Sequence, residues 1–218
     1  MADEDVDVGT WEGVAGLERE FELPKGFVQG LLKEDDWSFV IKLHALIEAS
    51  VAHMLTARLG ENLSEFVHGM SLRGRTSKLN LAKALGYLDS GAVSFVGMLA
   101  DLRNSLAHGV SNLTFSFRAY LTGLDDESLK RWLAAVDPDY DKPIEGEAMT
   151  GGEFAWKSPK LAMWAAAARV MTIAKQQSDV ERHLAAQRQV ALELYRRLPS
   201  DDVHILMDYH SIPGLGRR

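Results

Sequence analysis

The 218-residue chain contains no cysteine, so it has neither disulfides nor thiolate metal sites, and we expect a cytoplasmic protein. It has no run of about 18 or more apolar residues, and its first residues are acidic rather than basic and apolar. Both features predict a protein without membrane contact or signal peptide. A Gly-rich phosphate loop, paired histidines on one helical turn and a metal-type carboxylate cluster are also missing, so we predict no cofactor and no metal.

The composition that remains is that of an ordinary globular chain, with 46% hydrophobic and 25% charged residues. A chain of this length can bury a core without covalent cross-links. Its net charge of −7 is unevenly spread, because residues 1–36 hold 11 acidic and 3 basic residues and the remainder carries +1. The charge of the main part therefore does not exclude a nucleic-acid partner.

Apolar residues recur at helical spacing along most of the chain. One helix is predicted over 37–59, with Asp36 as its N-cap, and a second is predicted to end before Gly109. The predicted core positions of these two helices are Val40, Leu43, Ile47, Val51 and Met54, and then Phe95, Leu99, Leu102 and Leu106. The pattern predicts an all-α protein, an antiparallel helical bundle with a long C-terminal helical extension.

Four segments are predicted from these patterns. They are an acidic N-terminal arm (1–36), a helical core (37–124), additional helices that pack on or extend the core (125–198), and an irregular tail (199–218). Residues 137–157 have no clear period and are predicted to form a long loop, which Phe154 and Trp156 could order in part. A capping-box pattern at Ser178 indicates a break in the last helical stretch, whose second half is a candidate arm for gripping a partner subunit.

The residues richest in chemical groups lie at the end of the second predicted helix, where Arg103, Asn104, Ser105 and His108 fall within six positions. On an ideal helix Arg103 and His108 point about 140° apart. They converge if the helix unwinds near 107–109, if the long arginine reaches round, or if a second copy of the helix completes the pocket. The third alternative predicts a two-fold dimer with the site at its interface.

Two motifs carry a resemblance to a known family. Arg103-x4-His108, with Asn104 beside the arginine, resembles the R-x(4–6)-H signature of the HEPN domain. Upstream, residues 76–88 (TSKLNLAKALGYL) are similar to a segment of one HEPN-like group, the mannitol operon repressor family. The likeness covers about residues 35–175, and it implies an all-helical HEPN-like core.

The resemblance implies a metal-independent endoribonuclease that cleaves RNA through the RNA's own 2′-hydroxyl. His108 would then move protons, Arg103 would hold the phosphate, and Asn104 or Ser105 would orient the reacting groups. Asp101 is a supporting candidate on the same helix. Because DNA lacks the 2′-hydroxyl, only RNA would be cut. Such enzymes often act as homodimeric toxins or phage-defence components that an antitoxin or another partner protein holds inactive.

Two further expectations concern charged neighbours of this site. Glu48 lies at the edge of its helix's core face, and we expect it to contact Arg103, which lies at the matching edge. Arg73, Arg75 and Lys78 place three cations within six residues, a cluster suited to a phosphate backbone. The alternative for this cluster is solubility charge on a loop.

A second function belongs to a different class: a non-catalytic regulatory or protein-interaction module, like the mannitol operon repressor that residues 76–88 resemble. In this alternative Arg103 bonds Glu48 and His108 caps the last carbonyls of its helix. The two hypotheses differ in whether the Arg103 and His108 side chains are open to a ligand or engaged in internal hydrogen bonds.

Overall fold

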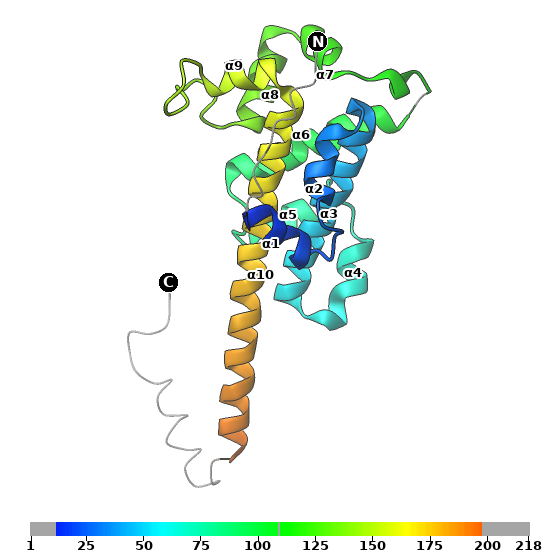
Figure 1. The fold of residues 1–218 in the computed structure, drawn as a ribbon. Coiled ribbons are helices and arrows are strands. Elements are labelled where there is room, and N and C mark those ends of the chain that lie inside the picture. Colours follow the sequence, from blue (N-terminus) through cyan, green and yellow to red (C-terminus); the bar gives the residue numbers. More distant parts are fainter. Residues whose placement is uncertain (1–11, 109, 198–218) are drawn as a thin grey trace. The chain divides into compact units, whose positions relative to one another are not determined.

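The computed structural model describes residues 12–108 and 110–197 (Figure 1). Over these ranges the chain forms ten α-helices and three 3-10 helices without a strand, which confirms the predicted all-α helical bundle. The α-helices are α1 (Glu12–Glu20), α2 (Phe27–Gly30), α3 (Asp36–Leu59), α4 (Ser64–Gly69), α5 (Lys78–Ala84), α6 (Ser90–Ala107), α7 (Phe117–Thr122), α8 (Asp126–Val136), α9 (Gly151–Lys157) and α10 (Pro159–Arg197). The 3-10 helices are η1 (Leu31–Lys33), η2 (Glu61–Leu63) and η3 (Val110–Thr114).

The chain divides into two units, residues 1–178 and residues 179–218. In the second unit the structure describes residues 179–197, the last part of α10. Its exposed apolar side chains include those of Val190, Leu192 and Leu194. The start of the predicted acidic arm (1–11) and the predicted tail (199–218) lie outside the described residues.

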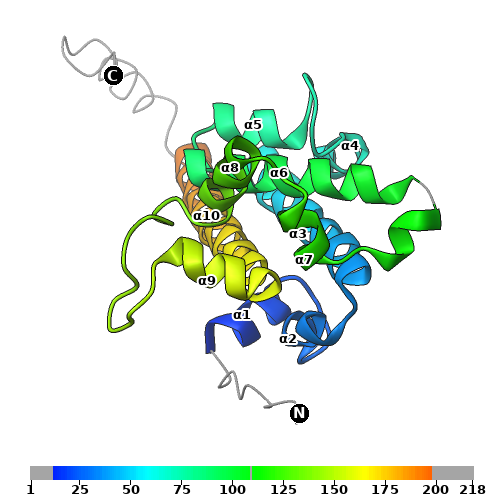
Figure 2. The ribbon, with the colours of Figure 1, turned by 90° about the horizontal axis from the view of Figure 1, so that it is seen from above.

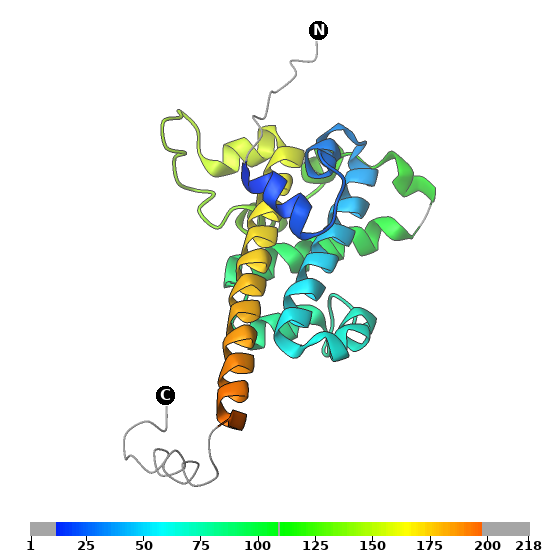
Figure 3. The ribbon, with the colours of Figure 1, turned by 60° about the horizontal axis from the view of Figure 1, so that its bottom comes forward.

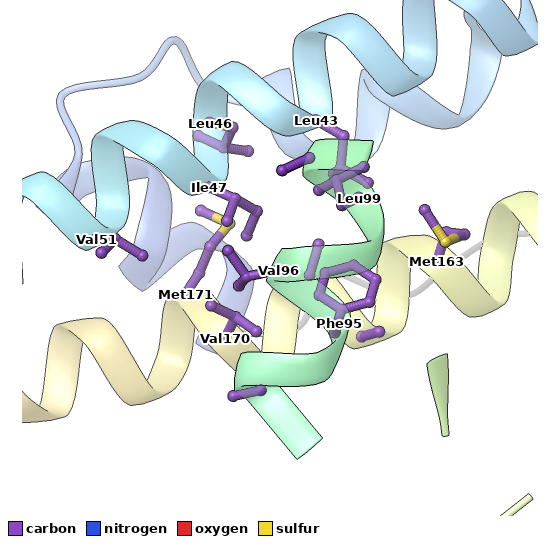
Figure 4. Close-up of a cluster of buried hydrophobic side chains, with 14 of the residues drawn as sticks. Leu43, Leu46, Ile47, Val51, Phe95, Val96, Leu99, Met163, Val170 and Met171 are labelled. Carbon is purple, nitrogen blue, oxygen red and sulfur yellow. The ribbon is translucent and has the colours of Figure 1, made fainter. Parts of the chain in front are cut away.

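The core of the first unit forms where α3, α6 and the first part of α10 meet. All nine core positions predicted on α3 and α6 are buried. Figure 4 shows α6 between α3 and α10, with Val96 of α6 close to Ile47 of α3 and Met171 of α10. Alanines such as Ala166 and Ala167 on α10 are also buried, and such small side chains let neighbouring helices approach closely.

Helix α3 begins one residue earlier than predicted. Asp35 is its N-cap, and its carboxylate accepts a hydrogen bond from the Ser38 N–H at 2.9 Å. The carboxylate of Asp36 instead accepts the Phe117 N–H at 2.9 Å and lies 2.9 Å from Lys160 Nζ. Asp36 therefore joins the N-terminal ends of α3, α7 and α10.

From residue 12 onward, the predicted N-terminal arm packs against the core. Val14, Leu17 and Val28 are buried, and Trp164 Nε1 donates to the Val28 carbonyl at 2.7 Å. The buried Glu18 carboxylate accepts the Gly26 and Val28 N–H groups at 2.8 and 3.0 Å. Figure 2 shows α1 and α2 on one side of α3 and α5 on the other.

Of two predictions for the second half of the chain, the loop was right only in part and the break in the last helix was wrong. The predicted loop 137–157 contains helix α9, which starts at a capping box formed by Thr150 and Glu153. Helix α10 continues through Ser178, which is buried and donates its hydroxyl to the Ala174 carbonyl at 2.9 Å instead of capping a new helix. The two-unit division nevertheless falls directly after Ser178.

By length and composition, α3 is also long and apolar enough to cross a membrane, with a mean hydropathy of 1.3 over its best window. Of that window, 67% is buried inside the structure. A buried central helix passes the same test, so this is weak evidence for a membrane span.

Candidate functional site at the end of helix α6

The C-terminal end of α6 carries the Arg103–His108 segment. The helix ends at Ala107, because His108 has extended backbone angles (φ −114°, ψ 111°). The helix therefore stops within residues 107–109, where unwinding was one of the three ways considered for bringing Arg103 and His108 together. Figure 3 shows α6 running from beside α10 at its N-terminal end to the opposite side of the unit at its C-terminal end.

The polar side chains of this segment differ in how far they are engaged. Arg103 is partly exposed, and its Nη1 donates to Asn104 Oδ1 at 3.1 Å. The Ser105 hydroxyl donates to the Leu102 carbonyl at 2.7 Å, so its proton is engaged within the helix. The His108 ring is exposed and forms no hydrogen bond among the described residues. Arg103 and His108 are likewise not bonded to each other within this described segment.

Other residues bond three of the carbonyl groups at this helix end. Asn112 Nδ2 donates to the Ser105 carbonyl at 2.9 Å and to the His108 carbonyl at 2.6 Å. Trp37 Nε1 donates to the Leu106 carbonyl at 3.3 Å. The non-catalytic alternative gives the His108 side chain the role of a cap, but these three carbonyls are bonded by Asn112 and Trp37 instead.

Glu48 pairs with Lys78 rather than with Arg103. The Lys78 side chain is 3% exposed, and its Nζ lies 2.8 Å from Glu48 Oε1. The same Nζ donates to the carbonyls of His68 at 3.2 Å and Met70 at 2.6 Å. With its three donors engaged in the protein, Lys78 is not available to a phosphate, so the expected three-cation cluster is reduced by one.

The other two cations of that cluster remain at the surface. Arg73 forms an ion pair with Asp101 and donates to the Gly97 carbonyl at 3.2 Å, so it ties its loop to α6. Asp101, predicted as a supporting residue of the site, is therefore paired with Arg73, and its negative charge offsets the positive charge of Arg73. Arg75 is exposed and has no ion pair among the described residues. Arg75 and Arg103 are the cations of the predicted set that are best placed to meet a ligand.

His44 is a neighbour of this site that the sequence did not single out. Its side chain lies on α3 and is only 7% exposed. Burial lowers the pKa of its imidazole; the Glu48 carboxylate opposes this shift, whereas the positive charges of Arg103 and Lys78 add to it. The charges of Arg103, Glu48 and Lys78 therefore all act on His44. The sequence signal for this neighbour was its position four residues before Glu48, which places both side chains on the same side of the helix.

Within residues 12–108 and 110–197 no group of three or more histidine, aspartate or glutamate side chains has a metal-binding arrangement. No protein-family model, curated protein or solved structure matches this chain. The geometry and chemistry of the α6 end are therefore the observations from which a function can be inferred.

Proposed function

We propose that the C-terminal end of α6 is the active site of a metal-independent endoribonuclease that cleaves RNA through its 2′-hydroxyl. One observation carries the proposal. The structural tasks that would otherwise explain Arg103 and His108 are performed by other residues: Lys78 pairs with Glu48, and Asn112 bonds the carbonyls of Ser105 and His108. The guanidinium and the imidazole are left at the surface, five residues apart.

These two groups suit the reaction. The attacking 2′-hydroxyl loses a proton and the leaving 5′-oxygen gains one, and an imidazole that titrates near neutral pH can serve either step. A guanidinium can hold the phosphate and stabilise the charge that grows on its oxygens in the transition state. Asn104, whose side-chain Oδ1 accepts a hydrogen bond from Arg103 Nη1 at 3.1 Å, would fix the direction of that guanidinium.

A homodimer is part of this proposal. In the homodimer the α6 end of a second copy would lie beside that of the first, so that Arg103 and His108 from both copies line one site. The proposed setting is cytoplasmic, with RNA as substrate and an antitoxin or other regulatory protein as the partner of a toxin or phage-defence enzyme. Arg75 is the proposed additional phosphate contact.

The second candidate is the non-catalytic regulatory or protein-interaction module. It is favoured by one specific observation: Lys78, one of the two lysines in the segment that resembles the mannitol operon repressor family, is a buried structural anchor. In this alternative the exposed groups at the end of α6 contact a protein instead of RNA.

The two candidates are separated by incubating a mixed RNA pool with the purified full chain in EDTA. The variants are Arg103→Ala and His108→Ala, with Arg131→Ala and His68→Ala as exposed controls on other helices. We expect cleavage by the wild type and both controls, with 2′,3′-cyclic phosphate ends. In the two site variants the rate should fall by about 10²–10⁴-fold. A folded, partner-free wild type that leaves the pool intact would favour the regulatory module.

A further inference from the structure

The last part of α10, residues 179–197, carries most of the exposed large apolar side chains of the described chain. Eight such side chains are exposed among the described residues, and five of them lie on this segment: Val180, Val190, Leu192, Leu194 and Tyr195. Their exposed fractions run from 43% to 60%. Apolar surface is unfavourable in water, and where it gathers on one element it marks an interaction site.

Most of these side chains share one face of the helix. At 100° per residue, an arc of about 140° contains Val180, Leu184, Val190, Ala191, Leu194 and Tyr195. We call these six residues the α10 stripe. The opposite face carries Arg182, Gln189, Glu193 and Arg196. An apolar stripe opposite a polar face is the pattern of a helix that packs on a partner through one side.

Two polar residues, His183 and Gln187, lie in the same arc as the α10 stripe. They bond each other, with Gln187 Nε2 2.8 Å from His183 Nε2. Their polar groups are therefore partly satisfied before any partner covers them. In paired helices, a polar residue within an apolar seam fixes the register of the pair.

The α10 stripe has the same apolar spacing in both directions from Gln187. Val180 and Leu194 lie seven residues before and after this glutamine. Leu184 and Val190 lie three residues before and after it. A second copy that runs in the opposite direction therefore meets apolar residues with apolar residues along the stripe. A two-fold interface between identical chains requires such a self-complementary surface.

The charges of the segment favour the antiparallel direction. Residues 188–197 contain three arginines, Arg188, Arg196 and Arg197, and one acidic residue, Glu193. A parallel pair would place two of these arginine-rich halves beside each other. An antiparallel pair places each of them beside residues 179–187, which contain two acidic residues and one arginine. The helix dipoles are also opposed in the antiparallel pair, which is favourable.

A membrane surface fits this segment less well than a second copy does. Helices that lie on membranes are rich in lysine and arginine on their polar face. Residues 179–197 instead hold four basic and three acidic residues, a net charge of +1. The segment is about 28 Å long, so one helix face per copy buries less than the roughly 800 Å² per partner of a standard interface. The pair should therefore exchange with the unpaired chain.

We propose that the α10 stripe is the contact surface for a second copy of this chain, in which the two 179–197 segments pair as antiparallel helices. The inference is independent of the RNA-cleaving function proposed above.

Because the chain contains no cysteine, cross-linking of introduced cysteines tests the pairing. Val180→Cys and Leu194→Cys are made in the full chain, one of them with an affinity tag. They are mixed and treated with a short bismaleimide, which bridges the roughly 8–10 Å between paired helices. We expect a crossed product that joins position 180 to position 194. Either variant alone should give little product, because its two cysteines lie about 21 Å apart along the antiparallel pair.

Two controls use the polar face of the same helix. Gln189→Cys lies opposite the α10 stripe and should stay unlinked. Val190→Glu, added to both cysteine variants, places like charges in the interface and should lower the crossed yield by about tenfold. Gln189→Glu, added in the same way, should leave the yield unchanged. Both altered residues are exposed, so thermal unfolding should be unaffected. The cross-link reports the α10 pair alone, whatever contact the α6 ends make.

Four results would overturn the proposal. Products of each variant with itself, without the crossed product, would show a parallel pair. A yield no higher than that of Gln189→Cys would show that the two copies do not pair here. A crossed product that survives Val190→Glu would remove the α10 stripe from the contact. Binding to phosphatidylglycerol vesicles that Val190→Glu abolishes, in place of cross-linking, would assign the stripe to a membrane surface.

Discussion

Lys78 and Glu48 form an ion pair of 2.8 Å in which the lysine side chain is 3% exposed and the carboxylate 34% exposed. The pair joins α5 to α3, and the two carbonyls that share the lysine Nζ, those of His68 and Met70, add the end of α4 and the loop after it.

Replacing Lys78 by Met should destabilise the fold by about 2–4 kcal/mol, because two carbonyl groups and a carboxylate lose their shared donor. Glu48→Gln should have a smaller effect, about 1 kcal/mol, since its amide oxygen still accepts and the position is partly solvated. The exposed control Lys83→Met should change stability by less than about 0.5 kcal/mol. Urea unfolding measures all three, and equal values for Lys78→Met and Lys83→Met would contradict the anchoring role.

Stability should fall on the acidic side of neutrality because of His44. Burial lowers the pKa of His44 in the folded protein below the value of about 6.5 that it has in the unfolded chain. Above that pH both states hold the neutral ring. As the pH drops below about 6.5, the unfolded chain takes up the proton first, so the free energy of unfolding decreases until the pH reaches the folded-state pKa.

The measurement is urea unfolding of wild type and His44→Gln between about pH 8 and pH 5, an interval that spans the ordinary histidine value. The variant should lose less stability than the wild type over that interval. His68→Gln, on an exposed histidine, is the control and should follow the wild type. Parallel curves for wild type and His44→Gln would show that His44 does not contribute.

Two glycines of α6 should respond to alanine with opposite signs. Gly97→Ala should stabilise the protein by about 0.5–1 kcal/mol, because its Cβ meets nothing within 4 Å and alanine is the better helix former. Gly91→Ala should destabilise it by about 1–3 kcal/mol, because the Cβ would stand 2.8 Å from Pro138 Cγ. Thermal unfolding of the two variants tests this, and stabilisation by Gly91→Ala would contradict the packing described.

Asn112→Ala should lower the free energy of unfolding only slightly and the rate of RNA cleavage strongly. Its amide group bonds the Ser105 and His108 carbonyls at an exposed helix end, so its loss should lower the free energy of unfolding by only about 0.5–1.5 kcal/mol. If the α6 end cleaves RNA, the rate should fall by a larger factor, because the His108 backbone is no longer held. A variant that cleaves at the wild-type rate would remove Asn112 from the positioning of the site.

The sequence predicted the helices well because their information is local. Apolar periodicity located the core faces of α3 and α6, and the caps fell within one residue of those predicted. Helix α9 was missed, although the residues of its capping box, Thr150 and Glu153, were visible in a segment otherwise rich in glycine and acidic residues.

The site was less predictable because its contacts join distant segments. Lys78 follows an arginine-containing loop and has the sequence context of a surface cation. Its burial depends on Glu48, 30 residues away, and on the carbonyls of His68 and Met70, ten and eight residues before it. The surroundings of Arg169 on α10 are equally unpredictable from the sequence, because its buried Nε and Nη2 atoms lie where α10 packs close to Gly91 of α6.

The carboxylate of Asp36 has a kinetic consequence. Its bonds to Phe117 and Lys160 close chain segments of 81 and 124 residues, and such non-local contacts form only after most of the intervening chain has been ordered. We therefore expect Asp36 to act mainly after the folding transition state. Its loss would leave the refolding rate nearly unchanged and would raise the unfolding rate, so this carboxylate sets how long the native protein persists.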